Sequence, residues 1–284
     1  MPKLEPLQFL TGLFGPALAN RSAPKRIALF IAVLLLLWLP VYGLVRWQVS
    51  DPNTVSILVI TAALVAFVVL LRFWSRTLYR SRLRDRYGLP PTQHNLREFA
   101  LGFGAAVLSL ALLFILQGLL DWVAWDGLPD AWGKMGAIAL EGLAVAVGIA
   151  LGEELVFRGW LLGELEEDYS RRTALWGSSL TFAALHFIKP VGEIVRTAPQ
   201  FPGLVLLGLI LVWARRGCRG RLGMAIGLHG GLVWGYYLIA VGNLVTYADG
   251  VPQWLSGVDQ NPLSGGLGLL GLGGLSLWVR SRRS

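Results

Sequence analysis

The 284-residue sequence has one cysteine, three histidines and few charged residues, which together make up only 15% of the chain. A single cysteine, Cys218, excludes both a disulfide framework and a zinc site built from thiolates. The His-Glu-x-x-His pattern of many zinc proteases is also missing. No internal repeat or low-complexity segment is present. The chemistry of this protein must therefore come from a small set of ionisable side chains.

What the sequence has in excess is apolar surface. Hydrophobic residues make up 55% of the chain and the mean hydropathy is +0.59, above the roughly 45–50% apolar content of soluble domains. The net charge of +8 lies in short clusters between apolar runs, which is typical of topology signals rather than of a nucleic-acid surface. These features indicate a polytopic membrane protein.

Eight apolar runs approach the length of about 20 residues that a membrane-spanning helix needs. We therefore predict an all-α, multi-pass helix bundle of about eight transmembrane helices. The predicted spans are roughly residues 27–45, 54–74, 99–120, 135–162, 174–188, 201–214, 222–245 and 264–279, of which the fifth, sixth and eighth are short.

Basic residues follow every second span, and they mark the cytoplasmic side. Lys3, Arg21, Lys25 and Arg26 precede the first span, and Arg280, Arg282 and Arg283 follow the last, so both termini are predicted to be cytoplasmic. The segments DWVAWDGLPDAW and TYADGVPQWLSGVDQNP contain no Lys or Arg and are predicted to be outer loops. The expected organisation is a cytoplasmic tail (1–26), N-terminal helices (27–130), a catalytic helix bundle (131–250) and a C-terminal helix with a basic tail (251–284).

Ionisable residues inside a span are costly to insert and indicate function. In GEELVFRGW, Glu154 and Arg158 are four residues apart, the spacing at which opposite charges meet on a helix. Glu153 is rotated by about 100° from Glu154, so one arginine cannot serve both carboxylates equally well. A carboxylate left over in an apolar setting is suited to activating water. Glu141, near the outer start of its span, is expected to reach the interface instead.

Two histidines lie on other spans, His186 in TFAALHF and His229 in AIGLHGGLVWGYY. At a rise of about 1.5 Å per residue, we estimate that they lie at a depth similar to that of Glu153. Three spans would then place costly residues in one layer. The third histidine, His94, is predicted to face solvent in a polar loop.

The motifs resemble a known family. EELVFR at 153–158 and FAALH at 182–186 are similar to the Glu-Glu-x-x-x-Arg and Phe-x-x-x-His signatures of the CPBP intramembrane proteases, which include the type II CAAX prenyl endopeptidases and the bacterial Abi proteins. His229 occupies the place of the third signature, and the resemblance covers about residues 135–245. It implies an intramembrane endopeptidase in a bacterial plasma membrane that acts on a membrane protein or lipidated, CAAX-like peptide and binds no nucleic acid.

The resemblance also implies roles for individual residues. Glu153 would activate water with help from His186, Glu154 and Arg158 would orient the site, and His229 would stabilise the oxyanion. Phe182 and Val233 are the candidate substrate-contacting residues. Glu153, His186 and His229 could hold zinc, and a glutamate mechanism without metal is equally compatible with them.

One position departs from the family pattern, because Val233 stands where a polar side chain is expected. Losing one oxyanion donor can lower a rate by about 100- to 1,000-fold. A second hypothesis is therefore a catalytically silent membrane adaptor or bacteriocin-immunity protein that retains the site as a polar network. A third is a transporter with a proton relay, although no matching inverted halves are visible.

Overall fold

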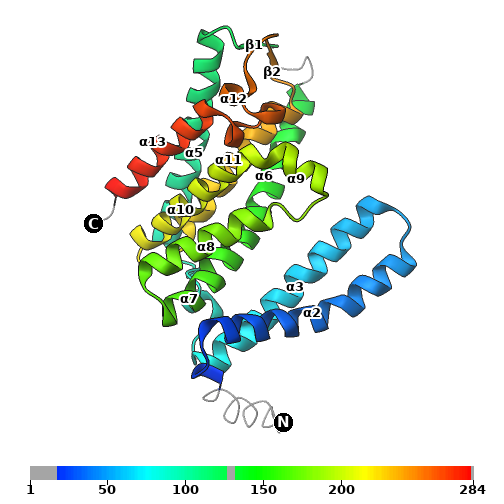
Figure 1. The fold of residues 1–284 in the computed structure, drawn as a ribbon, viewed down its shortest axis with the longest axis vertical. Helices are drawn as coiled ribbons and strands as arrows, with labels where there is room; N and C mark the ends of the chain where they lie inside the picture. The colour runs from blue at the N-terminus through cyan, green and yellow to red at the C-terminus, as the bar shows by residue number, and fades with distance from the viewer. Residues whose placement is uncertain (1–17, 127–131, 283–284) are drawn as a thin grey trace. The chain divides into compact units, whose positions relative to one another are not determined.

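The computed structural model describes residues 18–126 and 132–282, which are almost entirely helical (Figure 1). The expected all-α bundle is confirmed, with one short two-stranded ribbon that the sequence did not predict. Most of the predicted tail 1–26, including Lys3, lies outside the described residues. So do part of the first outer loop and Arg283. The chain divides into two compact units.

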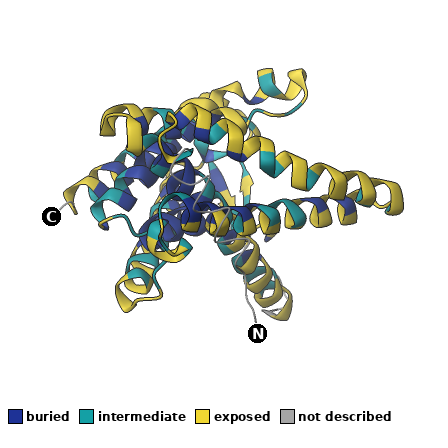
Figure 2. Ribbon diagram, turned by 90° about the horizontal axis from the view of Figure 1, so that it is seen from below, coloured by how far each residue is buried: buried dark blue, intermediate teal, exposed yellow. Residues whose placement is uncertain are grey.

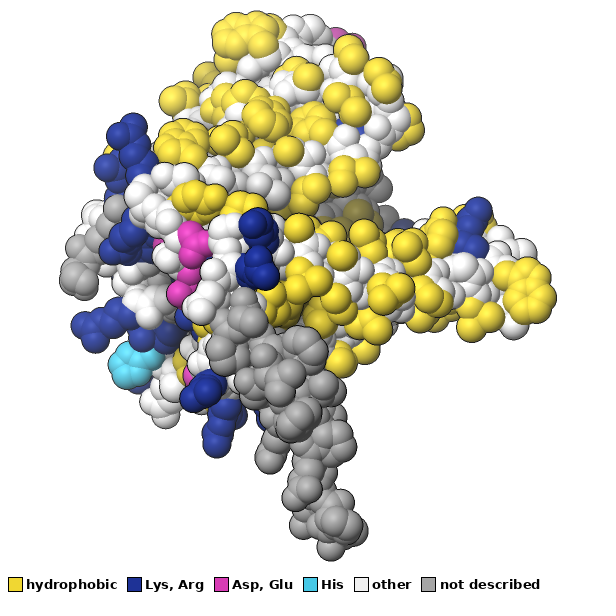
Figure 3. All heavy atoms as spheres, turned by 60° about the horizontal axis from the view of Figure 1, so that its bottom comes forward, with side chains coloured by type: hydrophobic (Ala, Val, Ile, Leu, Met, Phe, Trp, Pro, Cys, Tyr) yellow, Lys and Arg dark blue, Asp and Glu magenta, His cyan; other side chains and the backbone are white. Residues whose placement is uncertain are grey.

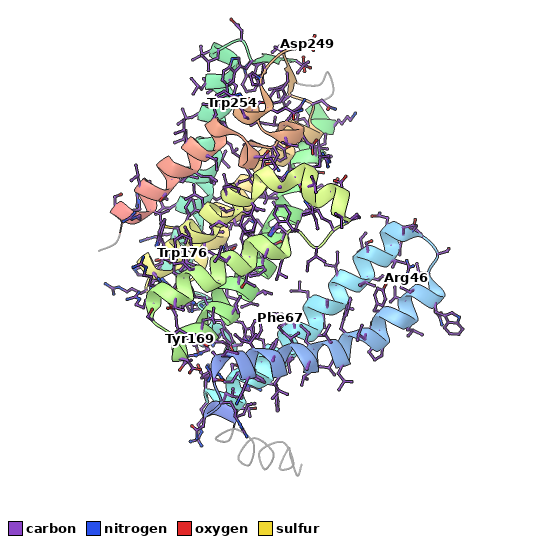
Figure 4. All side chains as sticks on the ribbon, viewed as in Figure 1. Arg46, Phe67, Tyr169, Trp176, Asp249 and Trp254 are labelled. Carbon is purple, nitrogen blue, oxygen red and sulfur yellow. The ribbon has the colours of Figure 1, made fainter. Side chains whose placement is uncertain are left out.

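The first unit contains the chain up to Arg86 together with Gly163–Ser170. Its elements are α2 (Ala23–Gln48), α3 (Pro52–Leu78), α4 (Leu83–Arg86) and α7 (Leu162–Asp168). The long helices α2 and α3 form a hairpin, and Figure 4 labels Arg46 near its turn. Asp51 ends this turn by accepting a hydrogen bond from the Thr54 N–H at 2.7 Å, which caps α3.

A buried ion pair joins the ends of this unit. Arg26 Nε donates to Glu164 Oε2 at 2.8 Å, and both side chains are almost fully buried. Trp74 Nε1 donates to the second oxygen of Glu164 at 2.9 Å. Arg26 was assigned above to a cytoplasmic tail. In the structure α2 begins four residues before the predicted span, so Arg26 lies inside the helix and fastens α2 and α3 to α7.

The second unit contains Tyr87–Leu162 and Arg171–Ser284. Its main helices are α5 (Gln93–Leu119), α6 (Trp132–Glu154), the π-helix η1 (Leu155–Leu161), α8 (Arg171–Leu185), α9 (Val191–Thr197), α10 (Phe201–Gly217), α11 (Gly223–Val241) and α13 (Gly266–Ser281). Short elements join them: β1 (Val123–Trp125), η2 (Ala198–Gln200), β2 (Val245–Tyr247), α12 (Gln253–Ser256), η3 (Val258–Gln260) and η4 (Pro262–Ser264).

Glycines spaced four residues apart on α11 bring its backbone against α5. A Cβ added at Gly227 would lie 2.1 Å from the Phe99 carbonyl oxygen, and one at Gly223 would lie 2.1 Å from that of Asn95. A Cβ at Gly231 would lie 2.7 Å from the Phe103 carbonyl. Small residues at this spacing allow close helix approach in membranes. This seam fixes α11, which carries His229, against α5.

Six helical stretches in the described residues are long and apolar enough to cross a membrane. They are Ala23–Gln48, Pro52–Leu78, Gln93–Leu119, Gly133–Asp168, Val191–Gly217 and Gly223–Val241. Helices also occupy the other two predicted spans, but α8 and α13 have only 15 and 16 residues. At 1.5 Å per residue these reach about 24 Å at most, short of the roughly 30 Å hydrocarbon layer.

The surfaces of these helices suit a bilayer. Figure 2 shows exposed residues along much of the length of several helices, and little of α2 is buried. Figure 3 shows hydrophobic side chains over much of the visible face, with Lys and Arg gathered apart from them. Because exposed apolar surface of this extent is unfavourable in water, these faces indicate contact with lipid.

The two loops predicted to be outer loops meet in the structure. β1 and β2 pair antiparallel, with Val123 opposite Tyr247, so both loops lie at the same end of the second unit. Trp125 and Trp254 are exposed there, and Figure 4 labels Trp254 and Asp249 at this end. Exposed tryptophans are typical of the membrane–water interface. Which side of the membrane this end faces stays a prediction.

Candidate active site

The predicted carboxylates lie where α6 changes into a π-helix. Glu153 and Glu154 are the last residues of α6, and Arg158 lies inside η1, where the Leu162 N–H donates to the Phe157 carbonyl five residues earlier. π-helical turns are rare and occur frequently at functional sites. The wider turn shifts the residues after Glu154 relative to an ordinary α-helix. The sequence gives no signal for this turn, because the spacing of its residues is compatible with a regular α-helix.

Glu154 and Arg158 form the buried ion pair that their spacing predicts. Arg158 Nη1 lies 2.9 Å from Glu154 Oε1, and both side chains are fully buried. Arg158 Nη2 also donates to the Gly208 carbonyl at 3.3 Å, and its guanidinium carbon lies 4.2 Å from the centre of the Phe182 ring. A guanidinium over an aromatic face is stabilised electrostatically. Phe182 therefore supports Arg158, in addition to any contact with substrate.

His229 is attached to the same carboxylate. Its Nδ1 lies 2.9 Å from Glu154 Oε1, and its side chain is almost fully buried. A carboxylate held by Arg158 can only accept hydrogen bonds, so Nδ1 must carry the proton. Nε2 then bears either a lone pair or, in the imidazolium, a second proton. The Glu154 contact thus fixes both the orientation of the ring and the atom that faces the site.

His186 follows the last residue of α8, rather than lying within a longer span as predicted. The helix ends at Leu185, and Pro190 then caps the next helix, α9. His186 Nδ1 lies 2.7 Å from the Phe182 carbonyl oxygen, which can only accept, so this ring also directs Nε2 away from the bond. The imidazole packs edge-on against the Phe182 ring at 4.6 Å.

Glu153 lies between the two histidines. Its Oε2 is 3.9 Å from His186 Nε2 and 3.9 Å from His229 Nε2. This oxygen is buried and has no hydrogen-bond partner among the described residues, although a third of the side chain is exposed. Glu153, the carboxylate that the sequence spacing leaves without an arginine partner, is thus also without one in the structure, where Arg158 pairs with Glu154. Glu141, which was expected to reach the interface, and His94, which was expected to face solvent, are both exposed.

An apolar cavity of about 470 Å³ adjoins the two histidines. It is lined by Phe182, His186, His229 and Val233 together with residues of α5, α10 and α13. Volumes of about 300–1,000 Å³ are usual for ligand sites. Val233 therefore presents an apolar surface beside His229. Tyr236, one turn further along α11, also lines the cavity, and its hydroxyl lies 3.5 Å from the Gln260 carbonyl oxygen.

The donor set expected for zinc is only partly assembled. Carboxylate and two imidazole nitrogens are ligands that zinc accepts, and the Nδ1 contacts of both histidines are the kind that orient metal ligands. Among the described residues, however, no group of three His, Cys, Asp or Glu side chains is arranged to hold a metal ion. Glu153, His186 and His229 do not form a closed coordination set as they stand.

Multiple apolar helices around a buried Glu–His–Arg cluster define an integral membrane protein with a polar site in its interior. Residues 135–235, which carry Glu153, Glu154, Arg158, His186 and His229, match the family described as Type II CAAX prenyl endopeptidase Rce1-like. The resemblance seen in the motifs is confirmed for this segment, and the match supports a protease. No curated protein and no solved structure gave a significant match to the chain.

Proposed function

We propose that this protein is an intramembrane endopeptidase in which Glu153 and His186 activate water for attack on a peptide bond. The observation that carries the proposal is Glu153 Oε2, which has no hydrogen-bond partner among the described residues and lies 3.9 Å from the Nε2 atoms of two histidines that line an apolar cavity. A water molecule about 2.8 Å from both Glu153 Oε2 and His186 Nε2 fits this separation. This water would donate one hydrogen bond to Glu153 Oε2 and one to His186 Nε2, and would direct an oxygen lone pair at the substrate carbonyl carbon.

The proposed reaction has two steps, addition of water to the peptide carbonyl and cleavage of the C–N bond. The water oxygen bonds to the peptide carbonyl carbon while one of its protons passes to Glu153. The carbonyl oxygen becomes an oxyanion, which the His229 imidazolium stabilises through Nε2–H. The C–N bond breaks as Glu153 returns its proton to the leaving nitrogen. The second water proton stays on the new carboxyl group and then passes to the amine, so the products are a carboxylate and an ammonium group, and Glu153 is an ionised carboxylate again.

Charge balance favours an imidazolium in this cluster. Glu153 and Glu154 carry two negative charges and Arg158 one positive charge, so one further proton makes the site neutral. Unbalanced charge in a low-dielectric interior is costly. Because His229 already directs Nδ1–H at Glu154, placing the extra proton on its Nε2 gives an oxyanion donor without breaking that bond.

The proposed substrate is a membrane-associated peptide, including prenylated, CAAX-like peptides. The apolar lining of the cavity beside the histidines supports this class, because a hydrocarbon group gains free energy there. A catalytically silent adaptor is the second candidate, favoured by Val233 in place of a polar side chain.

The test is proteolysis by the purified protein in detergent, comparing wild type with Glu153→Gln on prenylated and unprenylated membrane-anchored peptides. Cleavage by the wild type and its loss in the variant are expected. A parallel series with a chelator distinguishes a metal-dependent from a glutamate-dependent reaction. If folded wild type cleaves no peptide of the panel, the adaptor is favoured instead.

A further inference from the structure

The catalytic cavity shares part of its lining with a second hollow in the same unit. This second hollow has a volume of about 430 Å³ and lies between α5 and α13. Ser109, Leu113 and Gly271 line both spaces. These three residues therefore separate the two cavities where α5 packs against α13, near the middle of α5.

The hollow exists because two positions of α13 that face it, Gly271 and Gly274, have no side chain. A Cβ added at Gly271 would meet only Ser109 Oγ, at 3.7 Å, and one at Gly274 would meet nothing within 4 Å. Gly268, one turn earlier, differs, since its Cβ would lie 1.8 Å from the Pro262 carbonyl oxygen. Gly268 is thus required for close backbone contact, whereas Gly271 and Gly274 leave open space.

The outer side of the hollow is bordered by exposed leucines. Leu108, Leu112 and Leu270 line it and are 60%, 57% and 72% exposed. α5 is one of the helices apolar enough to span a membrane. The hollow therefore borders exposed apolar surface on one side and is divided from the catalytic cavity on the other side by Ser109, Leu113 and Gly271.

The lining determines what can occupy this space. All of its residues are apolar except Ser109, and none is charged. An extended peptide would bring backbone N–H and C=O groups into it without partners, at several kcal/mol for each group in hydrocarbon. A hydrocarbon chain has no such groups and gains free energy from apolar contact.

We propose that the seam between α5 and α13 is a lateral access route, through which an isoprenoid or acyl chain attached to the substrate passes from the bilayer into the catalytic cavity. Ser109, Leu113 and Gly271 form its threshold. The inference rests on the proposed peptidase function and adds the path of the lipid. Both helices lie outside residues 135–235, so the route is not part of the segment that matches the family.

The first test compares Gly271→Leu with Gly273→Leu. Gly273 lines neither cavity, and a Cβ there meets nothing within 4 Å, so its variant is the matched control. The readout is the ratio of kcat/KM for a farnesylated peptide to kcat/KM for the same peptide without the lipid. Gly271→Leu is expected to lower this ratio by about tenfold or more, because an added side chain obstructs a packed passage. The Gly273→Leu ratio should equal that of wild type. An unchanged ratio in Gly271→Leu would overturn the proposal.

The second test does not require hydrolysis, so its result is separate from that of the peptidase assay. Glu153→Gln protein is irradiated with a peptide whose alkyl chain carries a photoreactive diazirine, and the adducts are located by mass spectrometry. We expect adducts within residues 105–116 and 267–278, suppressed by excess farnesylated peptide and retained in excess phospholipid. Adducts confined to other helices would show that the chain does not pass between α5 and α13, and adducts suppressed equally by phospholipid would show that the hollow holds a membrane lipid. Either result would refute the route.

Discussion

His229 Nδ1 lies 2.9 Å from Glu154 Oε1, the same oxygen that accepts a hydrogen bond from Arg158. One buried carboxylate oxygen thus joins α11 to the end of α6 and holds the imidazole in one orientation. Glu154 Oε1 is engaged by both contacts, whereas Glu153 Oε2 has no hydrogen-bond partner among the described residues. We therefore propose different tasks for the two adjacent glutamates, one structural and one chemical.

Removing the arginine should destabilise the protein. Arg158→Ala leaves the fully buried Glu154 carboxylate without its guanidinium partner. Breaking a buried ion pair in this way costs about 3–5 kcal/mol. Equilibrium unfolding in detergent measures the effect. Arg172→Ala is the control, because Arg172 is exposed, and it should change stability by less than about 0.5 kcal/mol. Equal stability of the two variants would contradict the pairing.

Restoring a polar side chain beside His229 should increase the rate. Val233 is four residues from His229 and lines the same cavity, so Val233→Asn adds an N–H donor near the expected oxyanion. A donor of this kind is worth up to about 100- to 1,000-fold in rate, and we expect an increase in kcat of at least about tenfold. Single-turnover cleavage checks it. An unchanged kcat would mean that position 233 does not face the oxyanion.

The close contact between α5 and the glycines of α11 should not tolerate an added methyl group. Gly227→Ala places a methyl group 2.1 Å from the Phe99 carbonyl oxygen, so α5 and α11 must separate, at about 1–3 kcal/mol. Gly104→Ala on α5 meets nothing within 4 Å and should be neutral or stabilising by up to about 1 kcal/mol. The comparison uses thermal unfolding of both variants, and a Gly227→Ala protein as stable as wild type would argue against the close approach of these helices.

Cys218 should be unreactive in the folded protein. Burial, with Glu98 nearby, raises the pKa of this thiol to about 12, so at pH 8 its thiolate fraction is roughly 1,000-fold below that of a thiol with the ordinary pKa near 9. Alkylation followed by mass spectrometry should show labelling only after unfolding. Because the folded pKa is raised, the thiol's contribution to stability is complete below about pH 9 and is lost as the pH rises toward 12. Rapid labelling of folded protein at pH 8 would contradict the burial.

The sequence predicted the site better than its surroundings. Four-residue spacing was enough to pair Glu154 with Arg158, and the same helical geometry left Glu153 over. The contacts of His229 with Glu154 and of His186 with the Phe182 carbonyl were not predictable, because they depend on how three helices pack. The π-helix was missed since hydrophobic patterning does not distinguish a π-turn from an α-turn.

The glycines of α11 and α13 show what glycine spacing can and cannot predict. The spacing of Gly223, Gly227 and Gly231 is a small-residue pattern that indicates close helix packing, and it could have placed α11 against α5. The glycines of the last predicted span are also typical of close packing, but Gly271 and Gly274 border a hollow instead. Composition alone cannot separate a glycine needed for contact from one that leaves space.

The most direct measurement is a paired assay of Glu153→Gln and Glu154→Gln, recording peptide cleavage and the thermal unfolding midpoint of each. We expect Glu153→Gln to lose cleavage by at least about 100-fold, as the loss of a general base does, with an unfolding midpoint close to that of wild type. Glu154→Gln should lower both, because Arg158 and His229 lose their shared acceptor. Full cleavage by a folded Glu153→Gln protein would contradict the assignment of Glu153 as the base.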